Sequence, residues 1–186
     1  MTMNDGLVER LRAVLDRDAA IDLFRGAIGH ESITGNEANF VAFLAETMQR
    51  LGLEGLQTAE FLSGRPNVWA ERKGRGKGPR LLFIGHTDTV HVDGWREHWA
   101  GTEREDPFAA PIIDGAVWGR GSGDLKAGIC ASLAALSLLD KAGVDLVGDA
   151  LPLGNQAQQV ARRTGGEAQG IGARERKAGR CARGES

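Results

Sequence analysis

The sequence predicts an α/β fold in which helices flank a mostly parallel sheet. Helical and strand-like apolar patterns alternate along the first 150 residues, as they do in chains built from βαβ units. Four apolar residues at 81–84 are followed by a glycine and then by polar residues. This pattern is typical of a buried parallel strand that ends at a site. A chain of 186 residues can form one ordinary domain with a core.

The predicted helices rest on apolar residues spaced three and four positions apart. Such a pattern covers residues 6–29, as one helix or as two with a break. Thr34 and Glu37 have the spacing of a capping box, in which the glutamate reaches back to the threonine, and they predict the start of the next helix. A segment rich in Ala and Leu predicts a further helix over residues 125–142.

The predicted strands are short apolar or β-branched runs between turn signals. They are expected at residues 57–62, 67–72 and 80–84, with another strand beginning within 144–147. Asp114-Gly115 lies between two apolar pairs and predicts a β-hairpin. The basic, glycine-rich stretch 73–79 lacks the spacing of a phosphate-binding loop, so we expect a solvated turn between two strands.

The composition changes near residue 150. Residues 1–150 contain 16 Lys and Arg against 22 Asp and Glu, whereas residues 151–186 contain 7 against 3. The second segment is rich in Gly, Ala and Arg and has few apolar residues, so it can bury little surface. We therefore expect a folded domain over residues 1–150 and a disordered or irregular tail over residues 151–186.

Charge and hydropathy give few signs of a macromolecular partner. The net charge of −2 does not suggest a nucleic-acid partner. No apolar run approaches the ~20 residues of a membrane helix, and the N-terminus shows no secretory signal. We therefore expect a cytoplasmic protein without a membrane partner. Cys130 and Cys181 form no CxxC pair and predict no disulfide framework.

Two polar stretches carry the candidate chemistry. His86 and Asp88 follow the predicted strand at 80–84, and in extended chain their side chains leave the same face. This pairing suits a metal-binding imidazole beside a carboxylate that orients it. Asp124 follows the glycine-rich segment 119–123 at the start of a predicted helix, where it is either a helix N-cap or part of a site. The glycine spacing does not match that of a dinucleotide-binding loop.

Together these stretches resemble one family. Its members are zinc-dependent amidohydrolases and exopeptidases such as acetylornithine deacetylase, succinyl-diaminopimelate desuccinylase, aminoacylase and bacterial glutamate carboxypeptidase. The resemblance begins at Ser32 and extends to about Asp149. It is carried by His86-Thr87-Asp88, by Asp106-Pro107-Phe108 and by the stretch from Gly119 to Lys126.

The resemblance implies an α/β catalytic domain with two zinc ions, which cobalt can replace. His86 would bind one ion and Asp124 would bridge the two. Asp88 would be the catalytic carboxylate that orients His86 and raises its basicity. Two such ions can activate a water and polarise an amide carbonyl. The implied substrate is a small N-acyl amino acid or a peptide, and the implied reaction is hydrolysis of its amide bond.

The chain departs from the family's pattern after the helix predicted at 125–142. The resemblance implies a strand ending in two adjacent glutamates, one the general base and one a metal ligand, then an inserted dimerisation domain and a late histidine ligand. The 186 residues contain no Glu-Glu pair and no histidine after His98. We therefore expect an incomplete zinc-exopeptidase domain with little activity, and a truncated gene or shifted reading frame near residue 150.

Two alternatives to an enzyme remain open from the sequence. The first is a catalytically inactive fragment that folds poorly or acts as a weak binding module. The second is a nucleotide-binding protein that uses the glycine-rich loop at 119–123, although the spacing of its glycines argues against this. The sequence leaves the substrate's identity and the oligomeric state undetermined.

Overall fold

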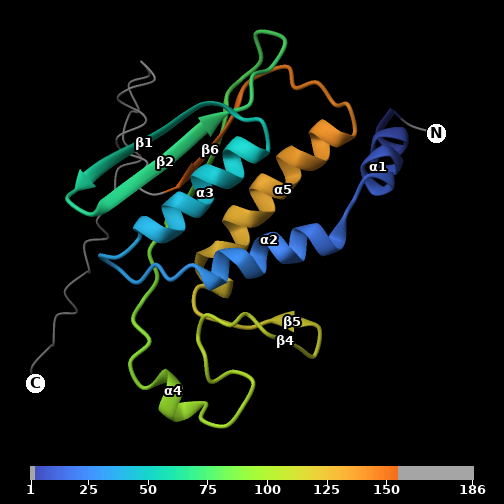
Figure 1. The fold of residues 1–186 in the computed structure, drawn as a ribbon. Helices are drawn as coiled ribbons and strands as arrows, with labels where there is room; N and C mark the ends of the chain where they lie inside the picture. Colours follow the sequence, from blue (N-terminus) through green and yellow to red (C-terminus); the bar gives the residue numbers. More distant parts are fainter. Residues whose placement is uncertain (1–2, 155–186) are drawn as a thin grey trace, which may run out of the picture. The chain divides into compact units, whose positions relative to one another are not determined.

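The sheet is mixed rather than mostly parallel. The computed structural model describes residues 3–154, and it confirms an α/β fold with a helix-flanked sheet (Figure 1). The strand order is β1-β2-β6-β3, and only the β3–β6 pair of the described residues is parallel. The strands are β1 Glu54–Leu62, β2 Arg65–Glu71, β3 Leu81–Gly85 and β6 Ala150–Gly154. β1 and β2 are antiparallel because residues 63–64 alone connect them, and so short a connection forms a hairpin.

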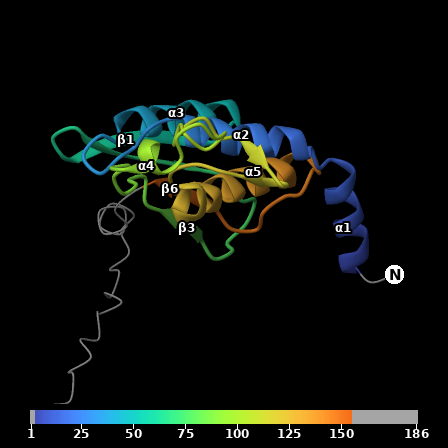
Figure 2. The ribbon, with the colours of Figure 1, turned by 90° about the horizontal axis from the view of Figure 1, so that it is seen from below.

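Two long helices pack against this sheet, and a third packs against those two. α3 (Ala38–Arg50) contacts β1 and β2, α5 (Ala127–Lys141) contacts β3 and β6, and α2 (Arg17–Gly29) contacts both helices. Figure 2 shows α5 lying between α2 and β3. The core combines residues of these helices and of β2: Ala27, Phe40, Val41, Leu44, Met48, Val68, Ala70, Ile129, Cys130 and Leu133.

The segment predicted as one or two helices at 6–29 forms two. α1 covers Met3–Ala13, and α2 begins at Arg17. The break is stabilised by Asp16, whose carboxylate accepts a hydrogen bond from the Ala19 amide at 2.9 Å. This is the bond by which an N-cap residue satisfies a free amide in the first helical turn. The predicted hairpin is also present, as β4 (Ile112–Ile113) and β5 (Ala116–Val117), and a short helix, α4, covers Trp95–His98.

The predicted capping box of Thr34 and Glu37 is wrong. Glu37 immediately precedes α3 but makes no side-chain cap, and its carboxylate accepts hydrogen bonds from the Gly35 amide and from Arg65. The Thr34 amide donates to the carbonyl of Thr89 at 2.9 Å. A charged partner on β2 and a backbone partner beyond β3 therefore replace the local pair.

Strand β3 is parallel, as predicted, but it is not buried. The side chains of Leu81, Leu82 and Ile84 are 57%, 40% and 52% exposed. Within residues 3–154 the strand pairs only with β6, so its other edge has no neighbour in this part of the chain. The apolar run that predicted burial therefore lies at the edge of the described sheet.

The prediction that a strand begins within 144–147 is also wrong, because the strand that follows α5 is β6 at Ala150–Gly154. All of its residues are buried, and it lies between β2 and β3. The sheet therefore passes the domain boundary predicted at residue 150. The tail predicted for residues 151–186 lies outside the described residues from 155 onward, and there it stays a prediction.

The turn Ser122–Lys126 and α5 together span the 20 residues Ser122–Lys141, which contain an 18-residue window with a mean hydropathy of 1.3. By length and composition alone this stretch could cross a membrane, although the sequence was expected to hold no such run. Its residues Ile129, Cys130, Leu133 and Leu136 are buried, and three of them belong to the core over the sheet. The core helix of an α/β domain accounts for this hydropathy.

The basic, glycine-rich stretch between β2 and β3 packs against the chain that leads into β6. The Arg75 amide donates to the Leu146 carbonyl at 2.8 Å, and the Gly76 amide donates to the Val147 carbonyl at 2.9 Å. Asp149 closes the contact, because its carboxylate accepts from the Gly74 amide at 3.0 Å. The stretch is a turn, as predicted, and its glycines permit close packing, because a Cβ at Gly74 or Gly78 would lie 2.5 or 2.6 Å from backbone atoms of Gly148.

The Asp149 carboxylate is expected to contribute stability that depends on pH. The hydrogen bond from Gly74 and the charges of Lys73 and Arg80 hold the pKa of Asp149 below its ordinary value. Its contribution is therefore complete above about pH 4 and is lost as the pH falls through the lowered pKa. Asp149→Asn should lower the urea midpoint at neutral pH, and the difference from the parent should shrink below about pH 4. An equal difference at both pH values would contradict this prediction.

Candidate active site

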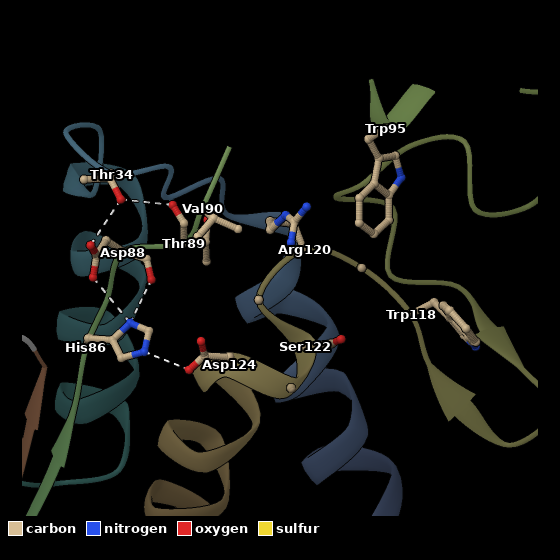
Figure 3. A pocket seen from close by; sticks show the side chains of 13 residues that line it. Thr34, His86, Asp88, Thr89, Val90, Trp95, Trp118, Arg120, Ser122 and Asp124 are labelled. Carbon is tan, nitrogen blue, oxygen red and sulfur yellow. Dashed lines mark hydrogen bonds and ion pairs between the residues drawn. The ribbon is translucent and has the colours of Figure 1, made fainter. Parts of the chain in front are cut away.

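The first part of the site follows the carboxyl end of β3. Thr89 holds the chain extended there, because its amide donates to the Ser32 carbonyl at 2.8 Å. The side chains of Thr87 and Thr89 are buried, whereas His86 and Asp88 lie on the other face and line a pocket. The alternation expected for His86 and Asp88 in extended chain is therefore observed (Figure 3).

The second part is the turn Ser122–Lys126, which leads into α5. Asp124 has an extended backbone within this turn, and its peptide bond to Leu125 is cis. Gly121 adopts a φ of +79°, and a Cβ there would come within 2.7 Å of the Thr89 side chain. Glycine therefore lets the turn lie directly against the residues that follow β3. The alternative of Asp124 as an N-cap is wrong, because α5 begins at Ala127 without a side-chain cap.

These two parts bring the three predicted site residues together. The Nε2 atom of His86 lies 2.9 Å from Oδ1 of Asp124, which is 38 residues away in the sequence. The Nδ1 atom lies 2.9 Å from the carbonyl oxygen of Asp88 and 3.3 Å from its Oδ1. The imidazole is therefore held on one side by Asp88 and faces a second carboxylate on the other (Figure 3).

The two carboxylates determine the charge of His86. Burial alone would lower the pKa of His86, but the hydrogen bonds to Asp124 and to the Asp88 carbonyl and the charges of both carboxylates outweigh this effect. The pKa of His86 therefore lies above its ordinary value, and a proton is favoured on the ring. A metal cation would be favoured by the same negative charges.

The donor set fits part of a metal site. An imidazole nitrogen and a carboxylate oxygen are common zinc ligands, and a carboxylate on the second ring nitrogen is the usual support for such a histidine. A catalytic zinc normally has three protein ligands. Within residues 3–154, no cluster of three or more His, Cys, Asp or Glu side chains could hold a metal. The described residues therefore supply two donors, His86 and Asp124, and no complete site.

The pocket around these donors has a volume of about 320 Å³. Its aromatic wall lies opposite His86 and Asp88 and carries Trp95 and Trp118 (Figure 3). Arg120 places its guanidinium 4.9 Å from the centre of the Trp95 ring. The full lining is Thr34, His86, Asp88, Thr89, Val90, Trp95, Trp118, Gly119, Arg120, Gly121, Ser122, Gly123 and Asp124.

Lys126, the last residue of the turn Ser122–Lys126, connects this turn to the end of α2 and had no predicted role. It is fully buried, and its ammonium donates to the carbonyls of Ala27 at 2.9 Å and His30 at 2.6 Å. Burial lowers the pKa of Lys126 to about 8. A lysine at the start of an apolar helix is the only local signal, and it does not reveal that the end of α2 supplies the acceptors.

A model of peptidase family M20/M25/M40 matches residues 82–157. The chain is 35% identical to the succinyl-diaminopimelate desuccinylase of Anaplasma marginale (strain Florida), over 66% of this chain and 30% of the relative. It is 35% identical to the enzyme of the same name from Methylobacterium radiotolerans, over 70% of this chain and 32% of the relative. The chain thus spans about a third of the length of these curated relatives.

Solved structures show the same fold. Human carnosine dipeptidase 1 superimposes with a TM-score of 0.67 at 21% identity, over 83% of this chain and 35% of that structure. The M20 family metallo-carboxypeptidase Sso-CP2 from Sulfolobus solfataricus gives a TM-score of 0.58 at 24% identity, over 79% and 32%. The resemblance found in the sequence is thereby confirmed. Residues 82–157 thus match peptidase family M20/M25/M40, and the similar proteins found by sequence and by structure fit this family, which includes a metallo-carboxypeptidase.

Proposed function

We propose that the chain carries half of the metal site of an amide hydrolase, with His86 and Asp124 as zinc ligands and Asp88 as the catalytic carboxylate that orients His86. One observation carries this proposal. Nε2 of His86 faces Oδ1 of Asp124 at 2.9 Å while Asp88 occupies the other ring nitrogen. Bound divalent ions, zinc or cobalt, would polarise the amide carbonyl and activate a water. The substrate class is a small N-acyl amino acid or a peptide.

We further propose that these 186 residues alone have little or no hydrolytic activity. The family resemblance implies a pair of adjacent glutamates and a late histidine, and the sequence contains neither. A positioned general base contributes about 10²- to 10⁴-fold to such a reaction. The same chain is therefore best regarded as an inactive form of the enzyme, or as a weak binding module, until further ligands are supplied.

The assay uses the purified chain with zinc or cobalt and three substrates: N-succinyl-diaminopimelate, N-acetylornithine and an N-acyl amino acid. We expect no turnover above the blank. Turnover that disappears in His86→Ala would show that the chain is active, and the second proposal would be wrong. His91→Ala is the matched control, because His91 belongs to a second His-x-Asp sequence but is exposed and lies outside the pocket.

Calorimetric titration with zinc tests the ligands independently of turnover. We expect weak binding that is lost in both His86→Ala and Asp124→Ala and retained in His91→Ala. Binding that survives both substitutions would contradict the assignment of the ligands. Tight, stoichiometric binding that depends on His86 would instead indicate further ligands outside residues 3–154.

A thermal shift with a dinucleotide but not with zinc would favour the nucleotide-binding alternative.

We also propose that a shifted reading frame or a truncated gene explains the change of composition. The buried strand β6 continues to Gly154, so the change would follow that residue rather than residue 150. Translation of the downstream nucleotides in the other two frames tests this. A strand ending in Glu-Glu and a later histidine are expected in one of them, and their absence from both frames would contradict the proposal.

A further inference from the structure

Asp88, the residue that orients His86, is itself held by side chains from two other segments. Its Oδ2 accepts a hydrogen bond from the Thr34 hydroxyl at 3.2 Å. The same oxygen lies 3.6 Å from Nη2 of Arg65, the first residue of β2. The Oδ1 atom remains for His86. The two oxygens of this carboxylate therefore face different partners, and Arg65 supplies the only cationic contact besides His86 among the described residues.

Arg65 is anchored by a buried carboxylate. Its Nε and Nη2 atoms lie 2.9 Å and 2.5 Å from Oε1 of Glu37. Glu37 is fully buried, and Oε1 also accepts from the Gly35 amide at 2.9 Å. A buried carboxylate without a cation is strongly unfavourable, so Glu37 and Arg65 fix each other. The hydrogen bond to Glu37 is also the main reason why the pKa of Arg65 lies above its ordinary value.

The charges form a row that ends at the site. Glu37 precedes α3, Arg65 begins β2, and Asp88 follows β3, so three separate elements contribute. Anion and cation alternate from Glu37 through Arg65 to Asp88, and His86 comes next. In such a row a guanidinium held by two bonds to one carboxylate has a fixed orientation toward the other.

We propose that Arg65, anchored by Glu37, is a positioning residue that fixes the Asp88 carboxylate and thereby the ring of His86. The inference rests on the proposed function, because it assigns Arg65 a role in presenting Nε2 of His86 to a metal. A purely structural ion pair would instead join α3 to β2 and leave the conformation of Asp88 unaffected. The two roles make different predictions for the side chain of Asp88.

The test uses Arg65→Met and the double variant Glu37→Gln/Arg65→Met. The single variant leaves Glu37 buried without its cation, so it is at risk of not folding. The double variant removes both charges and keeps similar volumes, so it should fold. Arg96→Met is the matched control, because this substitution removes an exposed contact to Asp106, at 3.4 Å, that does not involve the site.

The primary readout is the χ1 rotamer of Asp88, measured without metal from three-bond NMR couplings. We expect one rotamer in the parent and in Arg96→Met, and averaging in the folded double variant. In a further variant, Arg65→Lys, Asp88 should keep most of the population of its single rotamer, because a cation remains at position 65. A single Asp88 rotamer in the folded double variant would overturn the proposal.

Zinc affinity is the second readout. Loss of a group that supports a metal-binding histidine typically weakens metal binding by about 10- to 100-fold. We expect a loss of this size in the double variant and none in Arg96→Met. If the parent binds no zinc, the proposed metal site is wrong, whereas the rotamer measurement still decides the role of Arg65. Unchanged zinc affinity in the double variant would count against the positioning role.

Discussion

Gly148→Ala is expected to lower the free energy of unfolding by about 3 kcal/mol, near the upper end of the usual cost of overpacking. A Cβ at this position would lie 2.0 Å from the carbonyl oxygen of Pro79 and 2.7 Å from the carbonyl carbon of Gly78. Both are backbone atoms, so no side-chain rotation can relieve the overlap. The turn between β2 and β3 would have to move away from the chain that enters β6.

Urea unfolding followed by tryptophan fluorescence measures this effect, since the chain contains four tryptophans. The matched control is Gly6→Ala in α1, where an added Cβ meets nothing within 4 Å. Alanine should stabilise that helix by up to about 1 kcal/mol. Gly148→Ala within about 0.5 kcal/mol of the parent would mean that the two segments are not in close contact in solution.

The same contact illustrates which parts of the fold the sequence could predict. A turn at 73–79 follows from its glycines, which are a local signal. Its partner, Gly148, is distant in the sequence, and no periodicity connects the two. The mixed character of the sheet was missed for a related reason, because alternating apolar runs predict strands but not the direction in which β1 and β2 pair.

The site was predictable to the extent that its residues follow recognisable elements. His86 comes directly after an apolar run, and Asp124 comes directly after a glycine-rich turn, so each occupies a place where sites form. Taken alone, Asp124 was better explained as a helix N-cap. Its pairing with His86 became specific only through the family resemblance, and the structure brings the two side chains to 2.9 Å.

The supporting residues were not predictable, because their partners come from other elements. The spacing of Thr34 and Glu37 matches a capping box, yet Arg65 offers Glu37 a charged partner. The guanidinium carries a full positive charge that a backbone amide lacks, and it donates two hydrogen bonds to Glu37, so the tertiary contact is favoured. The exposure of β3 has a similar cause, since an apolar run indicates which side chains avoid water but not which neighbours cover them.

Lys126→Met should lower the free energy of unfolding by about 2–4 kcal/mol. The ammonium supplies hydrogen bonds to the carbonyls of Ala27 and His30, at the C-terminal end of α2. Methionine would leave both carbonyls without this donor, and each buried unsatisfied group costs about 1–3 kcal/mol. Removal of a buried charge offsets part of the loss, because burial already lowers the pKa of Lys126 to about 8.

Lys141→Met is the control for this change, because it is the same substitution at an exposed position on α5. Its effect should stay within about 1 kcal/mol, the scale of a charge near a helix C-terminus. Equal stability of the two variants would mean that desolvation of the ammonium cancels its hydrogen bonds. A larger loss in Lys126→Met would show that this lysine stabilises both the end of α2 and the turn that carries Asp124. The position of the site's second carboxylate would then depend on the buried contacts of Lys126.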